Sequence, residues 1–255
     1  MDKAYESRHH RMEETGWWFV ARRDFIMRLL KAEDKNSKIL DVGCCGGSLL
    51  RAMADNGFSN AVGIDKSLRA RDEGRKRGVR ILVMDGVKTN FSDREFDIVI
   101  ASDVLEHIRD DSAALKEWNR ILRPGGLLLV FVPAFAFLWS GHDKANAHYR
   151  RYGRTGLMAA LGKAGFAVTR SSYWNFALFF PTALLRIFSR LLRMDDKKDD
   201  NLFALPGFVN FLLISFLKLE NLLLGCMDFP AGVSVFAVAR KKIAQPSSFY
   251  ILSFN

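Results

Sequence analysis

The chain has 255 residues, 49% of them hydrophobic, and a formal net charge of +10. This is enough for one large domain with an embellishment and a sizeable core. A disulfide framework is not expected, because there are three cysteines and two of them, Cys44 and Cys45, are adjacent. No CxxC pair or His/Cys/Asp cluster with metal-ligand spacing occurs, so we expect no metal. Positive charge alone would allow nucleic acid as a substrate, but no recognition module or base-flipping motif accompanies it, and we expect no nucleic-acid partner.

The N-terminal region reads as one amphipathic helix over residues 13–30. A helix before the first strand of an α/β fold commonly covers a ligand, so we predict that residues 1–35 form a helical lid. Core packing is the simplest role for its paired tryptophans. In the alternative, Trp18 lines a substrate pocket while Arg22 binds a ligand carboxylate with its planar fork of donors.

Residues 39–50 form the most informative segment, an apolar strand that enters a glycine-rich turn and then a helix. Gly43, Gly46 and Gly47 let the main chain approach a ligand, because a side chain at those positions would collide with it. Asp41 stands just before the turn, where a carboxylate would repel the pyrophosphate of a nicotinamide cofactor. That carboxylate suits instead the ammonium and sulfonium groups of S-adenosylmethionine.

Three more carboxylates occur at or just after the ends of predicted strands. We predict these strands at residues 61–65, 79–85 and 96–102, followed by a helix at 111–122 and a fifth strand at 127–132. Asp65 lies about 20 residues after the turn, where an acidic residue accepts both ribose hydroxyls. Asp85, followed by Gly86, is placed to accept the adenine amine, and Asp103 to orient the cofactor's ammonium group. Strands that alternate with helices form a parallel sheet and bind ligands at these carboxyl ends.

These segments resemble those of class I S-adenosylmethionine-dependent methyltransferases with a type 11 or 23 domain, a group that includes quinone-biosynthesis C- and O-methyltransferases. The matching residues are DVGCxxG at 41–47, Asp65, Asp85, FDIVIASDVLEHI at 96–108 and RILRPGGLLLV at 120–130. The resemblance implies a Rossmann-like, seven-stranded, mostly parallel sheet with helices on both faces, a core at 36–174, and S-adenosylmethionine as the cofactor. The family usually has Gly where Cys45 stands, so we expect slightly displaced or weaker cofactor binding.

Residues 133–152 are predicted to be a loop that faces the transferable methyl group. The loop and the N-terminal helix hold the candidate acceptor-binding residues, which are Trp18, Asp143, His148, Arg150, Arg151 and Tyr152. His107 and His142 are candidate general bases for a hydroxyl acceptor. In the alternative, His107 only packs in its turn, and His148 and the arginines cap the helix expected at 155–163. The WWF and HxRRY patterns are similar to those of a bacterial subgroup associated with cell-surface sugar or lipid pathways.

A helical insertion interrupts the end of the core. We predict the sixth strand at 166–173, the insertion at 175–230, and the last strand and tail within 231–255. The insertion's first helix places Thr182, Arg186, Arg190 and Arg193 on one face, and its second, 208–224, is apolar nearly all round. Neither is expected to span a bilayer, because Arg186 interrupts the first and the uncharged run of the second, residues 202–217, is too short. Residues 175–225 could therefore contact a membrane surface, wall a pocket for an apolar substrate or form a homodimer interface.

The leading hypothesis is a methyltransferase that acts on an oxygen or nitrogen of a small or lipid-linked acceptor. A phosphate on that acceptor would explain Arg150, Arg151 and Arg154. The alternatives are C-methylation of a quinone-like ring, and a non-catalytic cofactor-binding or membrane-scaffolding protein. The N-terminus lacks the apolar stretch of a signal peptide, which predicts a cytoplasmic location, peripheral to the inner face of the cell membrane if the insertion binds lipid.

Overall fold

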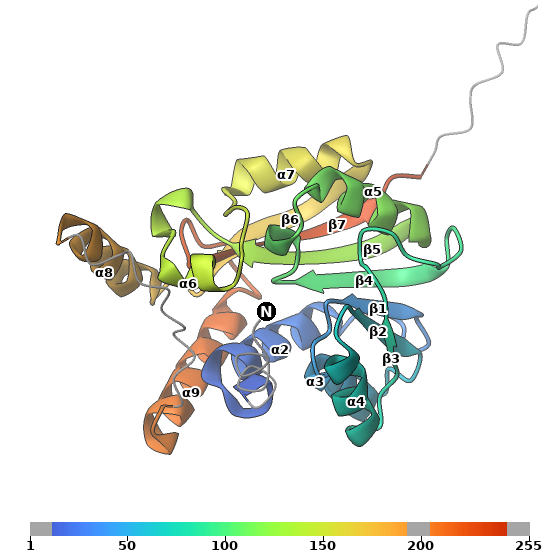
Figure 1. The fold of residues 1–255 in the computed structure, drawn as a ribbon, viewed down its shortest axis with the longest axis horizontal. Helices are drawn as coiled ribbons and strands as arrows, with labels where there is room; N and C mark the ends of the chain where they lie inside the picture. Colours follow the sequence, from blue (N-terminus) through green and yellow to red (C-terminus); the bar gives the residue numbers. More distant parts are fainter. Residues whose placement is uncertain (1–11, 193–204, 244–255) are drawn as a thin grey trace, which may run out of the picture.

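The computed structural model describes residues 12–192 and 205–243, which form one sheet with helices on both faces (Figure 1). The strand order is β3-β2-β1-β4-β5-β7-β6, and β7 alone runs in the direction opposite to the other strands. The strands are β1 (Ile39–Val42), β2 (Ala61–Asp65), β3 (Ile81–Val83), β4 (Phe96–Ser102), β5 (Leu122–Pro133), β6 (Phe166–Trp174) and β7 (Ser234–Lys241). This sheet confirms the predicted fold class.

The helices divide between the two faces of the sheet (Figure 1). Helices α5 and α7 cover one face, and α2, α3, α4 and α9 cover the other, with α8 projecting at one end. The helices are α2 (Trp17–Leu29), α3 (Ser48–Asp55), α4 (Leu68–Lys76), α5 (Asp111–Ile121), α6 (Gly141–Ala145), α7 (Arg154–Lys163), α8 (Phe179–Leu191) and α9 (Gly207–Leu223), with short 3₁₀ turns η1 (Leu105–His107) and η2 (Ala136–Leu138).

The core lies where the central strands are covered on both faces, which explains why β4 and β5 are nearly continuous apolar runs. Helix α2 belongs to this core as well as to the predicted lid. The Phe25 ring meets Phe131 of β5 and Phe236 of β7 edge to face, with centroids 5.9 Å and 4.9 Å apart. The N-terminal helix is therefore held firmly against the sheet.

Two predicted segments differ from the structure. The helix expected over 13–30 is broken at Gly16, whose backbone is extended (ψ 133°), so that residues 12–15 form a separate helical turn before α2. Glycine is a poor helix former, and a break there costs little. The segment 133–152 is not all loop, because it contains α6, whose start is capped by Asp143 accepting from the Ser140 N–H at 2.8 Å.

The insertion consists of two helices with different surroundings. Helix α9 packs along α2 (Figure 1), and its Asn221 accepts from Trp174 Nε1 at 2.8 Å and donates to the Ala21 carbonyl at 2.9 Å. Helix α8 has no buried residue. Within the described residues, none of the helices has the length and apolar character needed to cross a membrane. Arg193, which was predicted on the basic face of α8, lies outside the described residues.

Candidate active site

A cavity of about 380 Å³ opens at the carboxyl ends of β1, β2 and β4. This is the edge where ligands bind in open α/β sheets. Most of the predicted cofactor-binding residues line it, namely Arg22, Asp41, Gly43, Cys45, Asp65, Asp85, Gly86 and Asp103. Residues from the N-terminal region form its other side, and they include Glu13, Trp18, Phe19 and Arg23.

The cavity is strongly acidic around Asp41. This side chain is 4% exposed, and burial together with the nearby carboxylates of Glu13 and Asp65 raises the pKa of Asp41 well above its usual range. A cation bound beside these groups would relieve both the repulsion and the desolvation. These carboxylates therefore suit the ammonium and sulfonium groups of S-adenosylmethionine and would repel a pyrophosphate.

The turn after β1 reaches close to the cavity through two residues in the left-handed region. Gly43 has φ +66°, and a Cβ there would lie 2.5 Å from Val104. Cys45 has φ +47°, and its N–H donates to Asp65 at 3.1 Å. A side chain at such a φ is disfavoured, which gives a physical reason for the glycine that the family usually has.

Gly47 does not line the cavity, contrary to the prediction. It has φ +83°, and a Cβ there would lie 2.8 Å from Val79 and 3.0 Å from Ile81. The glycine thus allows the start of α3 to pack against β3. Gly46 does not line the cavity either, since its N–H donates to Glu13 at 3.0 Å.

Glu13 is a site residue that the sequence reasoning missed. Its side chain is buried, and its carboxylate accepts from the N–H of Gly46 and from both the N–H and the hydroxyl of Ser48, at 2.8–3.0 Å. It therefore caps the N-terminus of α3, where a negative charge is favoured. No local motif could reveal this contact, because more than 30 residues separate the partners.

Arg22 binds a protein carboxylate, whereas we expected it to bind the methionine carboxylate of the cofactor. Its Nη1 donates to Asp103 at 3.0 Å, and its Nη2 donates to Ser234 at 2.9 Å. Its guanidinium also lies over the rings of Trp18 and Trp174, 5.2 Å and 4.3 Å from their centroids. Arg22 and Asp103 line the cavity as a pair.

A second cavity of about 340 Å³ adjoins the first and shares Trp18, Phe19, Asp103, His107 and Asn146 with it. It lies between the N-terminal region, η1, the segment around α6, and α8. Its wall also contains Trp17, Glu106, His142, His148, Arg151, Thr182 and Arg186. A molecule bound in the second cavity would therefore face a ligand in the first.

Both candidate general bases line the second cavity. His107 is exposed and lines both cavities, and His142 lines the second. Burial lowers the pKa of His142 to about 4. The imidazole is therefore neutral near pH 7 and has a lone pair to accept a proton.

Asp143 positions two acceptor-side residues without lining either cavity. It is fully buried, with Oδ1 2.8 Å from His148 Nδ1 and its two oxygens 2.8 Å and 3.0 Å from the Arg151 guanidinium. Burial alone would raise the pKa of Asp143, but the hydrogen bonds from His148 and Arg151 hold it well below its usual range. The ion pair fixes both side chains at the cavity wall.

Arg150 and Tyr152 do not line the second cavity, which we call the acceptor cavity because it adjoins the cofactor cavity, and this is contrary to the prediction. Arg150 Nη1 lies 2.7 Å from Asp111 Oδ2, and the Tyr152 hydroxyl donates to the same oxygen at 2.8 Å. The structure thus ties both to the start of α5. His148 and Arg151 come from the same short segment but line the second cavity. The backbone conformation of this segment decides which side chains face the cavity and which face α5.

The basic face predicted for α8 is divided between the site and the surface. Arg186 lines the second cavity, whereas Arg190 is exposed and donates to the Trp139 carbonyl at 3.2 Å. Most of the exposed residues are apolar, and those at least half exposed are Phe180, Leu184, Leu185, Ile187, Phe188, Leu191 and Leu192. The helix thus directs Arg186 toward the site and presents an apolar surface to its surroundings.

A doubly wound sheet, an acidic cofactor cavity and an adjoining acceptor cavity define a cofactor-dependent group-transfer domain. A family profile described as a methyltransferase domain matches residues 9–171, and the chain belongs to that family. Its cofactor is S-adenosylmethionine, which supplies an activated methyl group when bound. Asp41, Asp65 and Asp103 line the cavity that would hold it.

The names of similar proteins refer to different methyl acceptors. The chain is 29% identical to a probable tRNA methyltransferase 9B of Bos taurus over 49% of its own length and 26% of that protein. It is 30% identical to a ubiquinone biosynthesis O-methyltransferase of Pelagibacter ubique, over 42% of its length and 47% of that protein. The chain thus spans less than half of either relative.

Solved structures show the same fold. A putative methyltransferase in complex with the Trm112 activator, from Haloferax volcanii, matches with a TM-score of 0.64 and 18% identity over 95% of this chain and 96% of that one. A phosphoethanolamine N-methyltransferase 2 from Haemonchus contortus, in complex with S-adenosyl-L-methionine, matches with a TM-score of 0.55 and 21% identity over 86% of this chain and 52% of that one.

Proposed function

We propose that this methyltransferase transfers the methyl group to an oxygen or nitrogen of a small or lipid-linked acceptor that carries an anionic group. The observation that carries the proposal is the position of Arg186 in the wall of the acceptor cavity. Within the described residues, its buried Nε has no hydrogen-bond partner. A guanidinium with an unused donor suits a phosphate or carboxylate, which accepts hydrogen bonds from its planar fork.

The apolar part of the acceptor cavity supports an acceptor with a ring or an alkyl portion. Trp17, Trp18 and Phe19 line one side of it, and aromatic walls bind such groups through large contact areas. The names of similar proteins include an O-methyltransferase of ubiquinone biosynthesis and an N-methyltransferase of phosphoethanolamine, which is anionic through its phosphate. Both oxygen and nitrogen acceptors therefore stay within the proposal.

Catalysis requires mainly that the acceptor atom, the methyl carbon and the sulfur be aligned, because methyl transfer is an in-line displacement. The shared wall of the two cavities, which contains Trp18, Asp103 and His107, is placed to enforce that alignment. His142 is neutral near pH 7 and is placed to take the proton of a hydroxyl acceptor.

The outer face of α8 supports a location where lipid-linked acceptors occur. We propose a cytoplasmic enzyme that meets its acceptor at a membrane surface, with the apolar residues of α8 in the interface and Arg186 turned toward the acceptor's head group. A helix that lies in the interface buries its apolar face among the acyl chains. This arrangement would bring the open acceptor cavity to the level of lipid head groups.

The test is a methyl-transfer assay with labelled S-adenosylmethionine and matched acceptors with and without a phosphate. We expect Arg186→Gln to raise KM for the anionic acceptors about 10-fold or more, with little change for the neutral ones, because a charged hydrogen bond is worth about 1.5 to 3 kcal/mol. Arg190→Gln is the matched control, since Arg190 lies on the same helix but does not line the cavity.

Three outcomes would contradict the proposal. The first is equal loss of activity toward charged and neutral acceptors in the Arg186 variant. The second is methylation of tRNA in preference to any small acceptor. The third is a product whose new methyl group is bonded to carbon, which would favour the C-methylation alternative.

A further inference from the structure

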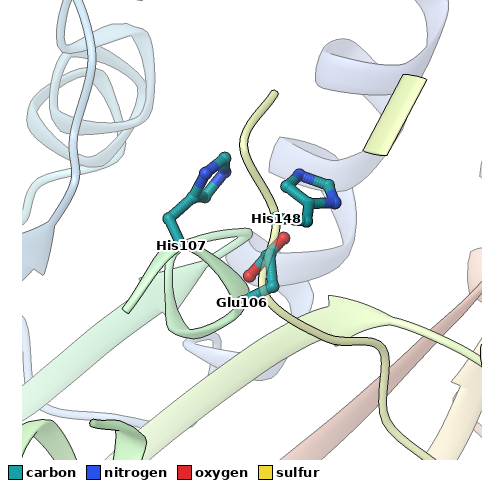
Figure 2. Close-up of side chains that lie close together, drawn as sticks. All are labelled: Glu106, His107 and His148. Atoms are coloured by element: carbon teal, nitrogen blue, oxygen red, sulfur yellow. The ribbon is translucent and has the colours of Figure 1, made fainter. Parts of the chain in front are cut away.

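Three side chains that can bind a metal ion meet in the acceptor cavity, although they are not clustered in the sequence. Glu106 and His107 belong to η1, and His148 follows α6 (Figure 2). One ligand atom from each lies within 4.8 Å of the others. A main-chain hydrogen bond holds the two segments together, because the N–H of Tyr149, which follows His148, donates to the Glu106 carbonyl at 2.8 Å.

Glu106 is the residue that most needs a partner. Its side chain is fully buried, and neither carboxylate oxygen has a hydrogen-bond partner among the described residues. A buried polar group without a partner costs free energy, and a carboxylate costs more than a neutral group. Figure 2 shows its carboxyl group close to the two imidazoles, which offer nitrogen atoms as further ligands.

His148 has the surroundings of a metal-binding histidine. Its Nδ1 is held by the Asp143 carboxylate at 2.8 Å, which leaves Nε2 as its ligand atom. Histidines that bind metals usually donate their other ring N–H to a carboxylate, which fixes the tautomer and the orientation of the ring. Asp143 is itself fixed by Arg151, so the ring position is set by two layers of contacts.

We propose that Glu106, His107 and His148 bind one divalent transition-metal ion at the wall of the acceptor cavity. Two imidazoles and one carboxylate suit Zn²⁺, Fe²⁺ or Mn²⁺, and three protein ligands leave coordination positions open. Ligand atoms at about 2.0 to 2.2 Å from such an ion lie about 3 to 3.6 Å apart when three of them share it with open positions. The group, whose ligand atoms lie within 4.8 Å of one another, must therefore contract by about 1 to 2 Å on binding, and His107 is the exposed member of the three.

The metal would give the proposed methyl transfer a means to activate a hydroxyl acceptor, so this role, unlike the binding itself, rests on the proposed function. A hydroxyl oxygen bound at an open position would have a lowered pKa, and its proton would pass to His142, the base of the proposed function in the same cavity. The resulting oxygen attacks the methyl carbon, the new O–C bond forms, and the S–C bond breaks with its electron pair left on sulfur. The products are a methyl ether and the neutral thioether.

Metal titration of the full chain tests the proposal. The protein is freed of metal with a chelator and titrated by calorimetry with Zn²⁺, Mn²⁺ and, without oxygen, Fe²⁺. The visible spectrum after addition of Co²⁺ reports imidazole ligation. We expect one site, and at least a 10-fold weaker Kd in Glu106→Gln and His148→Gln.

The control is His142→Gln, since His142 lines the same cavity but lies outside the group, and it should leave metal affinity unchanged. If the variants of the buried residues do not fold, the metal affinity of His107→Gln is the test, because a substitution of this exposed residue should leave the fold intact. Absence of metal binding by the wild type, or equal affinity in all variants, would overturn the proposal.

Titration with S-adenosylhomocysteine in parallel separates this inference from the proposed function. Binding of that product without binding of any metal would reject only the metal site. Metal binding with no methyl transfer to any anionic acceptor would reject the acceptor proposal and leave the site in place.

Discussion

The Arg22 guanidinium lies 3.0 Å from the Asp103 carboxylate and joins α2 to the residue that follows β4. The Arg22 side chain is 5% exposed, so its charge is largely removed from water and depends on this partner. The pair also stands on the wall shared by the two cavities, through Asp103. It therefore links the stability of the N-terminal helix to the geometry of the site.

A double-mutant cycle should show that this pair is coupled. We expect Arg22→Met and Asp103→Asn each to destabilise the protein, and the double variant to lose less than the sum, with a coupling of about 1 to 3 kcal/mol. Denaturant unfolding of the four proteins measures it. Strictly additive effects would show that the ion pair contributes no energy of its own.

Loss of the Asp65 carboxylate should remove most of the cofactor affinity. Asp65 lines the first cavity, and a buried ribose that loses its acceptor costs about 1.5 to 3 kcal/mol. Calorimetry with S-adenosylhomocysteine on Asp65→Ala measures the effect. Asp85→Ala is a useful comparison, because this half-exposed carboxylate is paired with Lys66 at 3.0 Å and should have a smaller effect. Unchanged affinity in a folded Asp65→Ala protein would refute the assignment.

Cys45→Gly should bind the cofactor as tightly as the wild type or more tightly. The substitution relieves a left-handed conformation that costs a side chain about 1 to 2 kcal/mol, and glycine adds an entropic cost of about 0.5 to 1 kcal/mol. We therefore expect the free energy of unfolding to stay unchanged or to rise by up to about 1.5 kcal/mol. Cys226→Ser, which changes an exposed cysteine away from the site, is the control. A large loss of affinity would instead assign Cys45 a direct contact with the cofactor.

His142 should make the protein less stable as the pH falls from 6.5 toward 4. Burial lowers its pKa from 6.5 to about 4, so between these values the unfolded chain binds a proton that the folded chain does not. Stability therefore rises with pH in this window, by up to about 1.4 kcal/mol per pH unit from this group. The stability of the wild type relative to His142→Gln, measured from unfolding curves, should therefore fall as the pH drops from 6.5 toward 4. Parallel curves would mean that His142 is exposed in solution.

The outer face of α8 should bind liposomes. We expect co-sedimentation of the wild type and its loss in Leu185→Gln/Phe188→Gln, since these side chains are 66% and 55% exposed. Most of the binding should survive added salt and neutral lipid, because Arg186 faces the cavity and, of the two arginines described on α8, only Arg190 is exposed. Leu68→Gln changes an equally exposed side chain on α4 and is the control. A dimer that the α8 variant dissociates, with no sedimentation, would make α8 an assembly element instead.

The sequence by itself determined the cofactor half of the site. Asp41, Asp65 and Asp85 could be placed because each lies at the end of a strand or just after it, and parallel strands bring such ends to one edge. This inference needs only local patterns, namely apolar runs, a glycine-rich turn and the spacing between them. The family resemblance added the seven-stranded, mostly parallel sheet, while the order of its strands came from the structure.

Only the tertiary structure decided the acceptor half. Arg151 and His148 reach the cavity while Arg150 and Tyr152 turn to Asp111, although all four lie within five residues of each other. In a regular helix or strand, the periodicity of the sequence predicts which way each side chain points. In this segment of short helix and turns, the direction depends instead on packing against distant elements. The hydrogen bond from Tyr149 to the Glu106 carbonyl is one such contact, and it brings together three potential metal ligands that a search for clustered spacing could not find.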